Sequence, residues 1–175
     1  MSVMRGHSNK NFKISEGKIM ANTTSLGMTR KFTKDSKTKA YDLLKWEKRD
    51  SVITNPMTGK AVFEQLDIDF PEGWSQNAIN IVAQKYFSGT PGSDDRETSL
   101  KQLINRVADT VTTHGLQEGY FEGAVEAENF REELKYILAT QRAAFNSPVW
   151  FNIGAAGRSQ QASACFILGI EDTMG

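Results

Sequence analysis

The amino-acid sequence predicts a mainly α-helical domain that carries one β-hairpin and leads into a single apolar strand near its end. Three observations support this prediction. Apolar residues recur at three- and four-residue spacing over residues 100–111, which is the period of an amphipathic helix. Two short apolar runs flank a turn that contains Pro56 and Gly59, as expected for a hairpin. Residues 162–170 form the short apolar run that is typical of a buried strand.

The composition is that of a globular protein and argues against several classes of function. Of the 175 residues, 39% are hydrophobic and 24% are charged. No apolar run approaches the roughly 20 residues of a membrane helix, so we expect no membrane partner. A single cysteine cannot form an internal disulfide, which favours the reducing cytoplasm as the location. One cysteine and two distant histidines give no zinc-site spacing, and no glycine-rich phosphate loop occurs, so no metal site is predicted.

Charge is distributed unevenly along the chain although the net charge is zero. Residues 1–40 hold nine Lys or Arg and two acids, 9 − 2 = +7, and residues 41–175 hold the remainder, 12 − 19 = −7. We interpret residues 1–40 as a basic, flexible arm. A contact with a polyanion is the alternative, but aromatic residues do not interleave with the basic ones as in a stacking platform. A nucleic-acid partner is therefore not expected.

Turn-forming and capping residues divide the next part of the chain. Residues 39–49 place apolar side chains among charges and favour a short helix or a docking segment. The hairpin follows over residues 51–65, and residues 66–74 then lead towards a helix start. Ser75 is a good N-cap for that helix, which should end near Gly89.

Two longer helices are predicted further along. The first is the clearest in the sequence, and its apolar face comprises Leu100, Leu103, Ile104, Val107 and Val111. Asp94 and Asp95 would lie at its positive N-terminus, and Gly115 would end it after His114. We interpret His114 as a residue at the negative end of the helix dipole, because the local sequence offers no partner for proton transfer. The second helix should span about residues 125–144.

The segment Asn146-Ser147-Pro148 is predicted to leave that helix in a turn, because Pro148 disfavours helical geometry at Ser147. Asn and Ser side chains in such a turn, with exposed backbone donors, suit a phosphate or a sugar hydroxyl. The bulky run over residues 149–151 would hold the turn rigidly.

The only cysteine, Cys165, lies in the apolar strand predicted over residues 162–170. Small residues precede it, so another molecule could approach the sulfur closely. A lone cysteine in a strand is otherwise an inert core residue, and the residues alone leave both interpretations open. Because a buried strand needs neighbours to pair with, we expect the chain to be one piece of a larger protein.

These segments resemble a known family. The runs QRAAFNSPVWFN, QASACFI and EDTM resemble the start of the catalytic barrel of adenosylcobalamin-dependent (class II) ribonucleotide reductases. Upstream, WEKRDSVI, PEGWSQNAINIVAQKYFSG, RETSLKQLINRV and GYF follow in that family's order. The resemblance implies a helical N-terminal domain over residues 41–145 and the beginning of an incomplete ten-stranded α/β barrel over residues 146–175. Only the arm over residues 1–40 falls outside it.

The resemblance also implies an activity and roles for four residues. The family converts ribonucleotides to 2′-deoxyribonucleotides for DNA synthesis, using adenosylcobalamin to create a thiyl radical. Cys165 matches one of the two cysteines that supply the reducing electrons and are reset by a thioredoxin-like dithiol. Ser147 and the Ala164-Cys165 backbone match substrate contacts. Asp172 matches an acid near the site of a deoxynucleotide effector.

Departures from the family pattern imply that this chain is not active alone. The radical cysteine, the second reducing cysteine and the cobalamin-contacting barrel do not occur in it, so we expect a fragment or split subunit completed by a barrel-bearing chain. One alternative is a non-catalytic module that docks on a reductase and regulates it. Another is a fragment of a di-iron class large subunit, although no N-terminal ATP-binding cone is present. The sequence leaves open a diphosphate or a triphosphate substrate.

Overall fold

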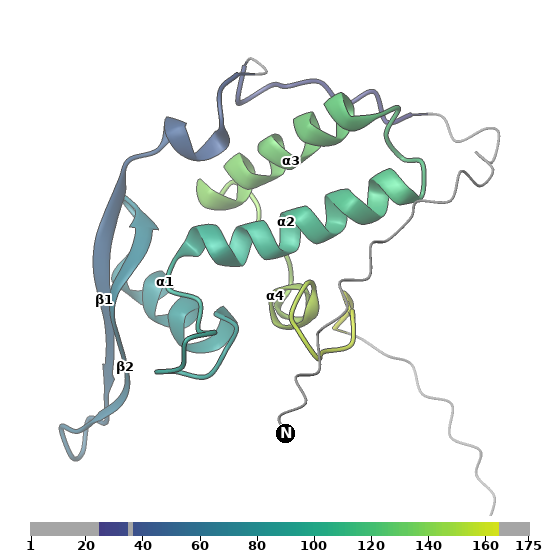
Figure 1. Cartoon of the computed structure of the whole chain (residues 1–175). Helices are drawn as coiled ribbons and strands as arrows, with labels where there is room; N and C mark the ends of the chain where they lie inside the picture. The colour runs from purple at the N-terminus through teal and green to yellow at the C-terminus, as the bar shows by residue number, and fades with distance from the viewer. Residues whose placement is uncertain (1–24, 35–36, 165–175) are drawn as a thin grey trace, which may run out of the picture.

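A computed structural model describes residues 25–34 and 37–164 of the protein. Figure 1 shows a β-hairpin along one side of a helical body, with α2 and α3 side by side and α4 against α2. In chain order the elements are the 3-10 helix η1 (Ala40–Leu43), strands β1 (Trp46–Thr54) and β2 (Ala61–Pro71), helix α1 (Gln76–Ile81), the π-helix η2 (Val82–Tyr86), and helices α2 (Leu100–Gln117), α3 (Ala124–Ala139) and α4 (Ser147–Asn152). The predicted helical domain with one hairpin is confirmed. The predicted barrel strand over residues 162–170 lies mostly outside the described residues.

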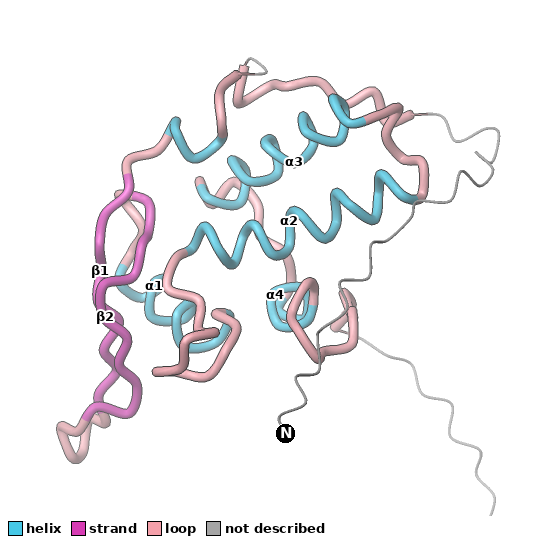
Figure 2. Tube along the Cα trace, in the orientation of Figure 1, coloured by secondary structure: helices cyan, strands magenta, loops and turns pink. Residues whose placement is uncertain are grey.

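The hairpin forms at the predicted turn, and its two strands are antiparallel (Figure 2). The Asn55 side chain accepts hydrogen bonds from the backbone N–H groups of Met57 and Thr58, at 2.8 and 3.2 Å. Gly59 adopts a positive φ of 67° that closes the turn. Strand β2 runs as far as Pro71, whereas the sequence suggested that its last part leads towards a helix. It continues because it buries Ile68 and Phe70 against the helices.

The helix predicted from Ser75 is confirmed, and the Ser75 hydroxyl accepts a hydrogen bond from the Ala78 N–H at 3.2 Å. The next helix, α2, has the predicted apolar face but a different start. Its N-cap is Ser99, which forms a capping box with Gln102. Asp94 and Asp95 precede this cap and lie outside the helix, so their predicted role is wrong.

The predicted ends of the two long helices are also wrong. Helix α2 continues through Gly115 to Gln117, and Gly115 is the point where the Phe121 ring packs closely. A Cβ at Gly115 would lie 2.7 Å from a Phe121 ring carbon, so glycine is required there for packing and not for ending the helix. Helix α3 ends at Ala139 because Gln141 turns away with a positive φ of 57°.

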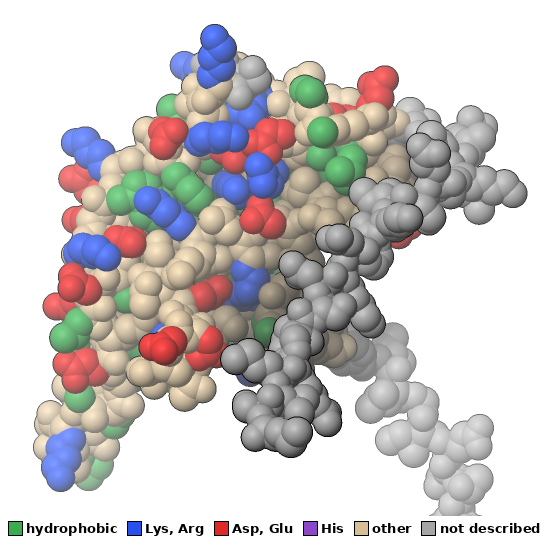
Figure 3. All heavy atoms as spheres, viewed as in Figure 1, with side chains coloured by type: hydrophobic (Ala, Val, Ile, Leu, Met, Phe, Trp, Pro, Cys, Tyr) green, Lys and Arg blue, Asp and Glu red, His purple; other side chains and the backbone are tan. Residues whose placement is uncertain are grey.

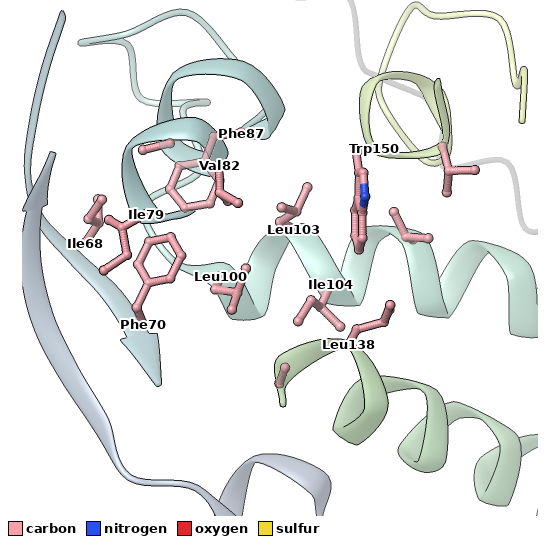
Figure 4. Packing of buried hydrophobic residues seen from close by; sticks show 14 of the residues in the cluster. Ile68, Phe70, Ile79, Val82, Phe87, Leu100, Leu103, Ile104, Leu138 and Trp150 are labelled. Atoms are coloured by element: carbon pink, nitrogen blue, oxygen red, sulfur yellow. The ribbon is translucent and has the colours of Figure 1, made fainter. Parts of the chain in front are cut away.

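One hydrophobic core joins the hairpin to all the helices (Figure 4). Strand β2 contributes Phe70, which lies among side chains of α1, η2 and α2. Trp150 points from α4 towards α2, near Leu103 and Ile104 (Figure 4). The largest side chains of this core with almost no exposure are Phe70, Ile68, Ile79, Leu100, Leu103, Ile104 and Val107. This shared core fixes the position of α4 relative to α2.

Residues 25–34 form an ordered segment along α3, which we call the N-terminal strap. Backbone N–H groups of the strap donate to carboxylates of α3, from Met28 to Glu126 at 2.6 Å and from Phe32 to Glu133 at 2.9 Å. Burial alone would raise the pKa of Glu133, but hydrogen bonds from Phe32 and Thr33 outweigh it, and the pKa is lowered. The prediction of a flexible arm is therefore wrong for the strap. Its partners lie about a hundred residues away in sequence, beyond the reach of local patterns.

Acidic and basic side chains are interspersed on the face shown in Figure 3, with no large patch of one sign. This face therefore offers no extended basic surface for a polyanion. No helix in the described part of the chain is long and apolar enough to cross a membrane.

Candidate functional site

Helix α4 carries the Asn146-Ser147-Pro148 segment that the sequence singled out. The turn predicted at Ser147 is wrong: α3 has already ended at Ala139, and the segment starts a new short helix with Asn146 as N-cap and Ser147 and Pro148 as its first residues. Proline is well tolerated there because the first N–H groups of a helix have no intrahelical acceptor. The Val149 side chain is buried in the core and anchors the helix there.

The Ser147 hydroxyl is half-buried and lies 3.1 Å from the Tyr86 hydroxyl, within hydrogen-bond distance. Either oxygen can donate. The Tyr86 ring in turn packs against Trp150 and Phe151 of α4, with centroid distances of 6.4 and 5.3 Å. Ser147 is thus held by a side chain from η2 while its remaining hydrogen-bonding capacity is free for a further partner.

Arg106 on α2 binds the opposite end of α4. Its guanidinium donates to the carbonyl oxygens of Trp150 and Ile153, at 3.1 and 2.8 Å. It also forms an ion pair with Glu97, at 2.8 Å between Nε and Oε1. The two side chains are only 11% and 10% exposed, so this is a largely buried pair whose remaining groups are hydrogen-bonded.

A second buried arginine, Arg96, organises the loop between η2 and α2. Its guanidinium donates to the backbone carbonyls of Phe87 at 2.7 Å and Gly89 at 2.9 Å, and also to that of Ala83. Burial lowers the pKa of Arg96, and the Glu97 carboxylate opposes this change. Arg96 stabilises the same loop as Glu97, but none of its hydrogen bonds goes to α4.

After α4 the chain turns back towards the helix before it reaches Ala164. Gly154 donates its N–H to the Gln160 side chain at 2.8 Å, and Gln160 donates to the Asn152 carbonyl at 3.2 Å. The Asn152 side chain donates to the Gln161 carbonyl at 3.2 Å. These bonds hold residues 160–161 against the end of α4. Residues 154–161 form a mostly exposed connection.

Two hollows flank α4. One, of about 320 Å³, is lined mainly by apolar side chains of α1, η2 and α2 and reaches Tyr86 and Trp150. The other, of about 770 Å³, runs between α2 and the segment that follows α4, and His114 and Gln160 are among its lining residues. No group of three or more His, Cys, Asp or Glu in the described part of the chain could hold a metal ion.

The structure thus places two of the four predicted site residues. Ser147 begins α4, and Ala164 is exposed at the end of the described residues. Cys165 and Asp172 lie outside the described residues, so the joint participation of these four in one site stays a prediction. Sequence reasoning missed Tyr86 and Arg106. The one signal for Arg106 was a basic residue directly beside the apolar stripe of a strongly amphipathic helix.

Comparison with known proteins decides the family. Residues 47–141, more than half of the chain, match the family described as class II vitamin B12-dependent ribonucleotide reductase. The chain belongs to this family. The match to the B12-dependent class favours the cobalamin interpretation over the alternative of a di-iron class fragment. The matched residues run from β1 to the residues just after α3, and so include the hairpin and the helices before α4.

Full-length members of the reductase family are close relatives. The chain is 51% identical over 134 residues to the vitamin B12-dependent ribonucleotide reductase of Streptomyces coelicolor, covering 77% of this chain and 14% of that protein. It is 50% identical to that of Streptomyces clavuligerus, with the same coverage. Identity to that of Rhodopirellula baltica is 36% over 172 residues, covering 82% of this chain and 16% of that protein. The chain therefore spans about a seventh of the length of these relatives.

Proposed function

We propose that the chain is the N-terminal part of a class II ribonucleotide reductase that converts ribonucleotides to 2′-deoxyribonucleotides. The observation that carries this proposal is the 51% identity over 134 residues to a vitamin B12-dependent ribonucleotide reductase. Because the chain covers 14% of that relative, the activity requires a barrel-bearing reductase chain or region as partner. Substrate, deoxynucleotide effector and a thioredoxin-like dithiol would be the further partners.

Ser147 is assigned to the substrate nucleotide. Its hydroxyl is held by Tyr86 at 3.1 Å, and a serine hydroxyl has one donor and two acceptor positions. Two of these three positions remain available for a phosphate or ribose oxygen. The Ala164-Cys165 backbone would supply a second contact, since the Gln160 and Asn152 bonds direct the chain past the end of α4. Asp172 is assigned to the effector side of the site.

Cys165 is assigned to the reducing pair. Its thiol and a second thiol of the barrel-bearing part form a disulfide, and the two electrons and two protons released reduce the ribonucleotide. The 2′-hydroxyl leaves as water, so the step balances. An external dithiol then reduces the disulfide by thiol–disulfide exchange.

Adenosylcobalamin supplies the initiating radical in this proposal, but the described residues do not fit it. A corrin with its nucleotide tail is larger than either hollow beside α4, at about 320 and 770 Å³. The smaller hollow is lined almost entirely by apolar side chains, with Gln141 and Tyr86 as its polar members. No described residue is therefore assigned to the cofactor, which is placed with the barrel-bearing part.

Reconstitution tests the proposal. The chain is mixed with the barrel-bearing reductase chain, adenosylcobalamin and a dithiol, and deoxynucleotide formation is measured over many turnovers. We expect wild type and the loop variant Ser159→Ala to be active, and Cys165→Ser to lose multiple turnover. Full turnover by Cys165→Ser would contradict the reducing role. A wild-type chain that binds the barrel-bearing chain without supporting turnover would instead favour a non-catalytic docking module.

A further inference from the structure

Helix α4 has six residues, too few to hold a helical conformation by itself. Its position must therefore come from contacts with its neighbours. The structure shows one such contact at each end. At its start, the Ser147 hydroxyl meets the Tyr86 hydroxyl at 3.1 Å. At its end, Arg106 donates to the carbonyls of Trp150 and Ile153, which a short helix leaves without intrahelical partners.

These two contacts belong to one closed network. Besides the α4 carbonyls, Arg106 Nη2 donates to the backbone carbonyl of Tyr86 at 3.3 Å. The same guanidinium therefore binds the end of α4 and the residue whose side chain holds the start of α4. Glu97 balances its charge through Oε1, and Glu97 Oε2 accepts the Ser88 N–H at 2.7 Å, two residues after Tyr86.

The backbone after α4 is also fitted closely to Arg106. Gly154 has a positive φ of 70°, and a Cβ there would lie 2.6 Å from the Arg106 carbonyl oxygen. Such a distance is too short for any side chain, so the chain passes directly over the backbone of α2. Helix α4 has little freedom to slide or rotate along α2.

We propose that Arg106 is a positioning residue of the substrate site. It fixes α4 and the Tyr86 backbone relative to each other, and thereby sets where the Ser147 hydroxyl lies. This inference rests on the proposed role of Ser147 in binding the substrate nucleotide. Arg106 itself is buried behind α4 and acts through Ser147, not by touching the nucleotide.

Lysine cannot replace the arginine in this role. Arg106 uses its planar fork to reach Glu97 and three backbone carbonyls of two segments at once. A lysine ammonium keeps the charge opposite Glu97 but is a compact donor that cannot span these acceptors. The variant Arg106→Lys should therefore retain the fold and the ion pair while α4 becomes less firmly placed.

A double-mutant cycle tests the proposal. The chain is combined with the barrel-bearing reductase chain without cobalamin, and the Kd of the ribonucleotide substrate is measured by equilibrium dialysis. We expect Ser147→Ala and Arg106→Lys each to weaken binding about tenfold, the scale of one lost polar contact. Because Arg106 acts through Ser147, the double variant should bind about as weakly as Ser147→Ala alone, and not about a hundredfold more weakly than wild type.

Arg96→Lys is the matched control. Arg96 is also little exposed and binds the carbonyls of Ala83, Phe87 and Gly89, but none of its hydrogen bonds goes to α4. Arg96→Lys should lower the unfolding midpoint to a similar extent as Arg106→Lys. It should change the substrate Kd by less than about twofold, because only Arg106 couples to Ser147. A Kd change as large as that of Arg106→Lys would overturn the positioning role, since general loss of packing would then explain both.

The outcomes separate this inference from the proposed function. If Ser147→Ala leaves the Kd unchanged, the assignment of Ser147 to the substrate is wrong. If Ser147→Ala weakens binding but Arg106→Lys has no effect, or adds its full effect to that of Ser147→Ala, the assignment of Ser147 stands. Only the positioning role of Arg106 is then wrong.

Discussion

The Glu133 carboxylate accepts hydrogen bonds from both the backbone N–H and the hydroxyl of Thr33, at 2.8 and 2.7 Å. Phe32 donates its N–H to the same carboxylate at 2.9 Å. One side chain of α3 thus fixes the N-terminal strap by three donors, and both Thr33 and Glu133 are buried. Ionised carboxylates are stronger acceptors than neutral groups, so this attachment depends on the charge of Glu133.

The strap should therefore loosen in acid. The pKa of Glu133 is lowered in the folded protein, so its contribution to stability is present above the unfolded value of about 4.3. It is lost as the pH falls through the lower folded pKa. In denaturant titrations, the free energy of unfolding of the wild type should fall as the pH is lowered from 7 to 3. The fall should be smaller for Glu133→Gln. At pH 7, Glu133→Gln should cost about 1.5–3 kcal/mol.

The control for this measurement is Glu64→Gln, at an exposed position of the hairpin. It should follow the wild-type curve. Hydrogen exchange adds a local readout, since the Phe32 and Thr33 amides should lose protection in Glu133→Gln while amides of α2 keep theirs. Equal protection of the strap amides in both proteins would contradict the attachment.

Gly154 offers a test of the close approach between α2 and the segment after α4. Gly154→Ala should destabilise the protein by about 2 kcal/mol or more, because it combines a positive φ with a collision at the Arg106 carbonyl. Gly157 has nearly the same φ, 69°, but open space around it. Gly157→Ala should lower the unfolding free energy by only about 1 kcal/mol, the cost of placing alanine at a positive φ. Equal unfolding free energies for the two variants would show that a Cβ at Gly154 does not collide with the Arg106 carbonyl.

The capping box of α2 can be tested against the acidic residues that precede it. Ser99→Ala should lower the unfolding free energy by about 1 kcal/mol, because the first turn loses its side-chain acceptor. Asp94→Ala should stay within about 0.5 kcal/mol, since Asp94 is exposed and lies outside the helix. A larger loss of unfolding free energy for Asp94→Ala would support the expectation from sequence that Asp94 stabilises the positive end of the α2 dipole.

Leu103 tests the shared core. Leu103→Ala should cost about 2–5 kcal/mol, because Leu103 is 1% exposed among side chains of several elements. Leu116, on the same helix but 43% exposed, is the matched position. Leu116→Ala should cost less than about 1 kcal/mol in the same denaturant titration. Similar losses at both positions would contradict the packing described for α2.

The sequence predicted those features that local patterns determine. The apolar stripe from Leu100 to Val107, the Ser75 cap and the turn at Gly59 each follow from spacing or from one residue's conformational preference. The end of α2 was misjudged because Gly115 serves close packing with Phe121, a contact that no local rule contains. The start of α2 at the Ser99–Gln102 capping box is a local feature that the sequence analysis overlooked, whereas the end of α2 depends on a tertiary contact.

The site was predictable only in part. Ser147 stood out through its neighbours Asn146 and Pro148, and the family resemblance gave it a role. Arg106 and Tyr86 could not be found in this way. They lie 41 and 61 residues before Ser147, and they matter because folding places one guanidinium between two segments.

The attachment of the strap has a consequence for synthesis on the ribosome. Chains are made from the N-terminus, so residues 25–34 leave the ribosome about a hundred residues before Glu126 and Glu133 are available. The hairpin, α1 and α2 can assemble during that interval, but the strap must wait for α3. Closing so long a loop carries an entropic cost that grows only slowly with length, so a late closure remains feasible. The first described segment to be translated is therefore among the last to find its partners.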